Sequence, residues 1–146
     1  MTVPGDRPTR SDRGPAVVAA AFAYFGIVFC LAFSLGVARI ALVAPLIGDV
    51  GAVCLEAPVI LAASWIACGW SVRLFEVEAA APARIAMGAI AFALLIAAEM
   101  AVGALLFAQK PLGAYQTWST AAGAVGLASQ VGFALVPLLR GRLRVG

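Results

Sequence analysis

The sequence predicts an all-α integral membrane protein, a bundle of four transmembrane helices with both termini in the cytoplasm. The composition is the first observation behind this prediction: 64% of residues are hydrophobic and 12% are charged, whereas soluble globular proteins are about 25% charged. The mean hydropathy of +1.04 agrees with it. The second observation is that the 146 residues contain apolar runs of about the 20 residues that one spanning helix requires, which leaves no room for another folded domain.

The predicted elements follow the apolar runs in chain order. Residues 1–15 are rich in Pro, Gly, Ser, Asp and Arg, which predicts a disordered cytoplasmic tail. Residues 16–140 form the predicted transmembrane domain, and residues 141–146 form a short cytoplasmic tail. We expect the four helices at about 16–38, 51–72, 85–108 and 118–140.

The connections between the first three runs contain helix-breaking or charged residues. Pro45, Gly48 and Asp49 follow the first run and predict a break rather than a continuing helix, in an apolar segment that we place at the membrane interface. The next connection carries charges that predict a solvated, partly self-paired turn, namely Arg73, Glu76, Glu78 and Arg84.

The distribution of basic residues predicts the orientation. In a four-span topology, both tails and the second connection lie on one side, which carries Arg7, Arg10, Arg13, Arg73, Arg84, Arg140, Arg142 and Arg144. The other side carries only Arg39 and Lys110. Because basic residues favour the cytoplasmic side, both termini are predicted to be cytoplasmic, in a bacterial-type inner (plasma) membrane.

Several classes of function are disfavoured by what the sequence lacks. It contains no histidine, which removes imidazole metal ligands and histidine-based catalytic triads. Cys30, Cys54 and Cys68 form no CxxC pair, and HExxH, GxSxG and phosphate-loop motifs are absent. We therefore expect no enzyme, no cofactor and no metal, with an intramembrane enzyme acting on lipid as a distant alternative. The net charge of +3 is explained by topology, so nucleic acid is not an expected partner.

Two acids lie inside the predicted helices, Glu56 in the second and Glu99 in the third. An ionised carboxylate in the membrane interior costs roughly 2.5 to 3.5 kcal/mol, so each acid is expected to face the bundle interior, to be protonated or to be paired. At 1.5 Å per residue, Glu56 would lie on the order of 8 Å and Glu99 on the order of 14 Å below the external boundary. We expect the two acids to face each other across the bundle, with Arg39 at its external opening and Asp49 nearer the outside.

These acids permit a functional and a structural interpretation. In the first, Glu56 and Glu99 bind a proton, a cation or a basic substrate group. Pro58 is then a helix break that frees a backbone carbonyl, and Gln130 completes the polar lining of the binding site. In the second, each acid bonds a polar group of another helix and fixes helix packing. Both interpretations remain open at the level of the sequence.

The resulting prediction of function is a small multi-pass inner-membrane protein without enzymatic activity. It would act as an accessory or self-associating membrane subunit that contains a buried carboxylate pair. Ala124, Ala128 and Gly132, which recur every four residues, favour the close helix packing that such a role requires. Its expected partners are the lipid bilayer and either further copies of the chain or a larger membrane complex. The alternative is a small proton- or cation-coupled transporter or channel that uses Glu56 and Glu99.

Overall fold

The computed structural model describes residues 10–107 and 119–143. The predicted tails at residues 1–9 and 144–146, and the predicted helix ends at 108 and 118, lie outside the described residues. The described elements are all helical: α1 (Arg10–Ala38), the π-helix η1 (Arg39–Val43), α2 (Ala44–Leu74), α3 (Ala81–Phe107) and α5 (Ala121–Arg142). Helix α1 thus begins inside the segment that the sequence assigned to a disordered tail.

Three continuous helical stretches are long and apolar enough to cross a membrane: Gly14–Leu74, Ala81–Leu105 and Ala121–Arg142. The all-helical prediction is confirmed for the described residues, and these stretches fit a multi-pass membrane protein. The prediction of four separate helices is wrong. The residues expected to connect the first two runs are themselves largely helical, so that the two runs form one stretch of 61 residues, and the predicted break is confined to a kink at Gly48.

The helical connection has a physical explanation in its own residues. Residues 40–43 are apolar, and helical hydrogen bonds satisfy their backbone groups within the segment itself. Pro45 lies in the first turn of α2, where a proline removes no hydrogen bond because the first N–H groups of a helix have no partner within it. Of the residues that predicted a break, Pro45 thus begins a helical segment, and Gly48 is the non-helical one.

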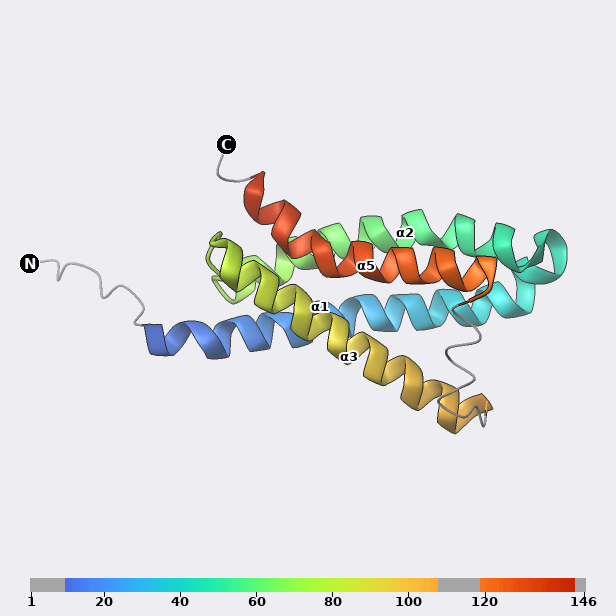
Figure 1. The fold of residues 1–146 in the computed structure, drawn as a ribbon, viewed down its shortest axis with the longest axis horizontal. Coiled ribbons are helices and arrows are strands. Elements are labelled where there is room, and N and C mark those ends of the chain that lie inside the picture. Colours follow the sequence, from blue (N-terminus) through green and yellow to red (C-terminus); the bar gives the residue numbers. More distant parts are fainter. Residues whose placement is uncertain (1–9, 108–118, 144–146) are drawn as a thin grey trace, which may run out of the picture.

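The change of direction between α1 and α2 involves one residue with a non-helical backbone, Gly48. Its φ of 78° and ψ of 164° lie in a region that is essentially restricted to glycine, because a side chain would clash with the backbone. Helices α1 and α2 consequently lie side by side and run in opposite directions (Figure 1). We call the end of the bundle that contains η1 and Gly48 the hairpin end.

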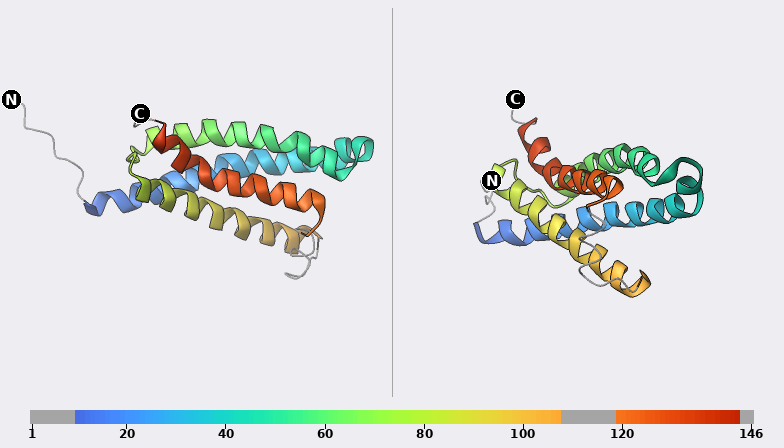
Figure 2. Two further views of the ribbon diagram at one scale, coloured as in Figure 1. Left: turned by 45° about the horizontal axis from the view of Figure 1, so that its top comes forward. Right: turned by 45° about the vertical axis from the view of Figure 1, so that its right-hand side comes forward.

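Helices α1 and α2, the two arms of the first stretch, form a ring with α3 and α5 in which each contacts two others. The contacting pairs are α1 with α2, α2 with α5, α5 with α3, and α3 with α1. The start of α1, the connection between α2 and α3 and the last turn of α5 lie at the end opposite the hairpin end, which we call the terminal end (Figure 1). Figure 2 shows that α3 diverges from the other helices towards the hairpin end.

The buried core lies mainly in the half of the bundle at the terminal end. Tyr24, Met87 and Phe133 are its largest apolar members, and each is at most 1% exposed. No described side chain of α1 after Val28, or of α3 after Leu95, is buried. Close packing and helix divergence thus occur in opposite halves of the same bundle.

Candidate functional site

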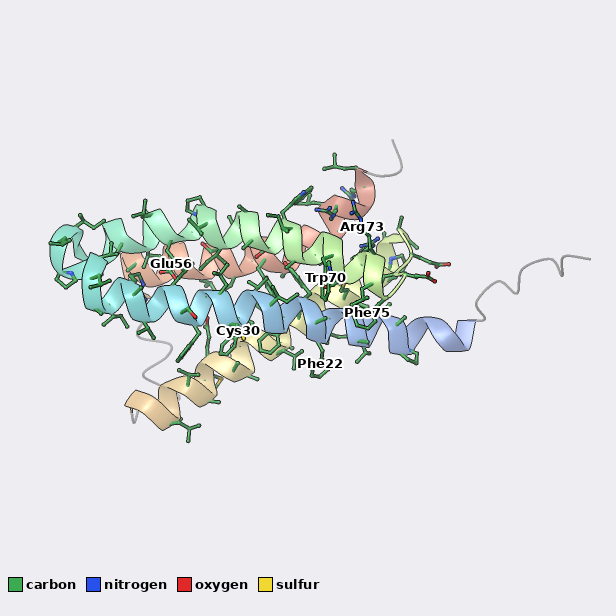
Figure 3. All side chains as sticks on the ribbon, turned by 180° about the vertical axis from the view of Figure 1, so that it is seen from behind. Phe22, Cys30, Glu56, Trp70, Arg73 and Phe75 are labelled. Atoms are coloured by element: carbon green, nitrogen blue, oxygen red, sulfur yellow. The ribbon has the colours of Figure 1, made fainter. Side chains whose placement is uncertain are left out.

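One polar pair joins the two arms of the α1–α2 hairpin. The Nε atom of Arg39, the first residue of η1, lies 2.8 Å from Oε2 of Glu56 in α2. The two side chains are 26% and 14% exposed, so the ion pair is largely shielded. Figure 3 shows Glu56 towards the hairpin end, far from Trp70, Arg73 and Phe75. The pair therefore holds η1 against α2 close to the turn.

A second polar pair joins α3 to α5. The side-chain nitrogen of Gln130 donates to both carboxylate oxygens of Glu99, at 2.6 and 2.7 Å. The carbonyl oxygen of the same amide, Oε1 of Gln130, is buried and has no hydrogen-bond partner among the described residues. Glu99 lies beyond Leu95, the last buried residue of α3, so the pair connects α3 to α5 in the part of α3 that diverges.

The two acids have different partners and are not bonded to each other. Glu56 is paired with Arg39, which the sequence placed close to it, and Glu99 with Gln130, which the sequence named only as part of a polar lining. Asp49 is exposed and forms no ion pair with any described residue. The candidate residues thus separate into two helix-to-helix pairs with Asp49 outside them.

The expected helix break at Pro58 is not found. Pro58 is exposed within α2, and the non-helical backbone angles inside this helix are those of Gly48. A proline removes one backbone hydrogen bond, but a helix embedded in a bundle continues through it when its neighbours hold it in place. The described residues also contain no group of three or more His, Cys, Asp or Glu side chains that could hold a metal ion.

A third polar contact, between Tyr24 and α5, was missed by sequence reasoning. The Tyr24 hydroxyl donates to the backbone carbonyl of Phe133 at 2.8 Å, and the two rings stack with centroids 4.4 Å apart. The Phe133 carbonyl needs a donor because the residue four positions later is Pro137, which has no N–H. That proline was the available signal, since it marks a carbonyl that another helix must satisfy.

Two arginines at the terminal end are also held by backbone carbonyls. Arg84, predicted to lie in a solvated turn, is only 2% exposed and donates to the carbonyls of Val77 and Glu78. Its buried position corrects the prediction, because two carbonyls after the end of α2 lack helical partners and accept these bonds. Arg140 donates from NH1 to the carbonyl of Trp65 at 2.7 Å and lies over the Trp65 ring.

Comparisons with known proteins identify no relative of this chain. No protein-family model matches it, and neither a curated protein nor a solved structure is significantly similar to it.

The described arrangement is chemically simple. The polar contacts that could carry a role include the Arg39–Glu56 ion pair, the Glu99–Gln130 acid–amide pair, the bond of Tyr24 to a carbonyl, and the carbonyl bonds of Arg84 and Arg140. In each of these contacts except those of Arg84, a side chain of one helical segment bonds a side chain or a backbone carbonyl of another segment. They are suited to holding helices in register, and the acid–amide pair is in addition suited to proton exchange.

Proposed function

We propose that the chain is a small multi-pass inner-membrane protein without enzymatic activity, which acts as an accessory or self-associating membrane subunit. In this proposal α1, α2, α3 and α5 each cross the bilayer once, and both termini are cytoplasmic. Supporting this orientation, Arg73, Arg84, Arg140 and Arg142 belong to the elements at the terminal end, whereas Arg39 lies at the hairpin end.

One observation carries the proposed role: each intramembrane acid has its partner on a neighbouring helical segment. Glu56 is bound by Arg39, and Glu99 by Gln130. Polar groups that bond across helices in this way fix the register and the choice of neighbour in a membrane bundle. A structural role requires that each acid is bound by a hydrogen-bonding or charged partner, whereas a transport pathway requires an acid that can release its partner.

The topology is tested by labelling single cysteines in cells. After replacement of Cys30, Cys54 and Cys68, the variants Ala80→Cys and Asp49→Cys place one thiol in the connection between α2 and α3 and one at the hairpin end. A membrane-impermeant maleimide should label only Asp49→Cys in intact cells and should label Ala80→Cys after permeabilisation. Labelling of Ala80→Cys in intact cells would overturn the orientation.

The role is tested with Glu99→Gln in the full-length protein. An amide at this position still accepts a hydrogen bond from Gln130, so folding and abundance should remain close to those of the wild type. Crosslinking in native membranes should give the same homo-oligomer or complex for both proteins. Neither protein should conduct protons or monovalent cations when it is reconstituted in liposomes under an imposed gradient.

The second candidate is the proton- or cation-coupled transporter, and one detail at Glu99 favours it. Both carboxylate oxygens accept from a neutral amide, and Oε1 of Gln130 has no partner. A proton on Glu99 would supply the donor that this oxygen lacks. Liposome flux in the wild type that Glu99→Gln abolishes, with folding intact, would replace the structural role by this one.

A further inference from the structure

Arg140 is a partly buried cation in the last turn of α5, and its side-chain bonds to described residues all go to neutral groups. Its NH1 atom donates to the Trp65 carbonyl, and its guanidinium carbon lies 5.2 Å from the centre of the Trp65 ring. No acidic side chain among the described residues forms an ion pair with it. The positive charge of Arg140 is therefore positioned by the fold without being neutralised by the fold.

The surface of α2 is shaped to receive this guanidinium. A side chain at Gly69 would collide with the NH2, Cζ and Nε atoms of Arg140, so the guanidinium lies directly against the glycine backbone. Trp65 precedes Gly69 by one helical turn and provides the aromatic face. Because two independent features of α2 fit one arginine of α5, the position of this charge is a built feature of the bundle.

A second arginine without a neutralising partner among the described residues, Arg73, lies one helical turn after Gly69 on the same face of α2. Arg73 follows Gly69 by four residues, the spacing that puts two side chains on one face. It is exposed, and no hydrogen bond or ion pair to its side chain is found in the described part of the chain. Trp70, 53% exposed, lies beside it near the end of α2 (Figure 3), as befits an anchor at the membrane interface.

We infer that Arg140 and Arg73 form a binding site for the phosphate of an anionic phospholipid, between α2 and α5 at the terminal end. A guanidinium binds phosphate oxygens through a planar fork of N–H groups, and basic sites between helices on the cytoplasmic side bind anionic lipid headgroups. The other N–H groups of Arg140 form no hydrogen bond with a described residue, so they can donate to such a ligand. A lipid is favoured over a free anion because apolar residues of α2 flank the charges.

The assignment of this lipid to a leaflet depends on the proposed topology, whereas the binding of the lipid does not. The test therefore uses purified full-length protein in detergent, where topology plays no part. Native mass spectrometry counts the phosphatidylglycerol and phosphatidylcholine molecules, of identical acyl chains, that each protein retains. The wild type should retain phosphatidylglycerol in preference, whereas equal retention of the two lipids would overturn the site.

Three variants locate the binding. Arg140→Gln and Arg73→Gln should each weaken phosphatidylglycerol retention about fivefold, the effect expected for one basic residue near an anionic lipid. Arg142→Gln is the matched control, because it removes the same charge from the last turn of α5 and lies two residues from Arg140, on a different face. Equal weakening by Arg142→Gln would show that net charge alone attracts the lipid and would overturn the site.

The remaining outcomes also decide the proposal. Arg73 is exposed, so Arg73→Gln stays informative even when Arg140→Gln fails to fold, and unchanged retention in Arg73→Gln would exclude the two-arginine site. Inorganic phosphate at millimolar concentration should not displace phosphatidylglycerol. Displacement by phosphate would identify a small-anion site in place of a lipid site. An incorrect topology would instead be revealed by the cysteine labelling, which leaves the retention measurements unchanged.

Discussion

The two halves of the bundle are held together by different kinds of interaction. At the terminal end, Met87 and the stacked Tyr24 and Phe133 are buried where helices approach closely. Towards the hairpin end, α3 diverges and the helices are joined by Arg39–Glu56 and Glu99–Gln130. Close packing dominates the first half, which adds the polar contacts of Tyr24 and Arg140 with backbone carbonyls, whereas pairs of polar side chains join the helices in the second half.

This difference indicates where substitutions should matter most. Membrane helices gain little from hydrophobicity against one another, so tight contact supplies most of their association free energy. Polar contacts between membrane helices average about 0.6 kcal/mol in double-mutant cycles. Variants in the packed half should therefore destabilise the protein more than variants of the polar pairs.

The largest effect is expected for Gly88→Ala in α3. A methyl group at this position would collide with the backbone carbonyl of Ala134 in α5, and a backbone cannot rotate away as a side chain can. Overpacking of this kind costs about 1 to 3 kcal/mol, and we expect a loss near the upper end. Denaturation with sodium dodecyl sulfate in mixed micelles measures the change in the free energy of unfolding.

Gly126→Ala provides the matched control for this prediction. It introduces the same methyl group into α5, at a position where no atom lies within 4 Å of the added carbon. Its unfolding free energy should equal or slightly exceed that of the wild type, because alanine favours helix more than glycine does. Equal destabilisation by both variants would disprove the role assigned to close packing at Gly88.

An intermediate effect is expected for Tyr24→Phe. The variant keeps the ring that stacks on Phe133 but removes the donor to the Phe133 carbonyl, which Pro137 leaves without a helical partner. A buried carbonyl without a partner costs about 1 to 3 kcal/mol, and we expect a loss near 1 kcal/mol in the same denaturation measurement.

The second variant in this test is Pro137→Ala in the Tyr24→Phe background. Alanine restores the backbone N–H four residues after Phe133, so it should recover part of the stability lost with the hydroxyl. If Pro137→Ala destabilises the wild type and the Tyr24→Phe protein equally, the tyrosine does not act through this carbonyl.

The sequence predicted the long helices because runs of apolar residues are a property of single segments. It did not predict that residues 39–50 are largely helical, because Pro45 and Gly48 are compatible both with a loop and with the start of a new helix. Gly48, at which the sequence predicted a break, has a non-helical backbone and lies where the chain reverses. Helix existence and the place of the reversal were thus readable from the sequence, and the helical state of the residues around Gly48 was not.

The candidate site was predictable in its residues but not in its pairing. Glu56, Glu99, Arg39 and Gln130 stand out because polar groups are rare in apolar runs. Their partners depend on the rotation of each helix about its own axis, which a depth estimate along the helix leaves undetermined. The expected pairing of Glu56 with Glu99 followed from similar depth alone, whereas the observed pairs follow from which helices are neighbours.

The smallest effect is expected when the Arg39–Glu56 ion pair is broken. Glu56→Gln leaves Arg39 near the hairpin end with a side chain that is 26% exposed, and arginines in such positions extend their charged group to the interface. Partly exposed ion pairs contribute about 0.2 to 1 kcal/mol, so the loss should be less than that for Tyr24→Phe.

A double-mutant cycle with Arg39→Gln isolates the coupling between the two side chains. A coupling larger than the effect of Gly88→Ala would reverse the comparison and make the polar half the dominant source of stability. A coupling of a few tenths of a kcal/mol would assign the pair to holding the turn in register rather than to stabilising the bundle.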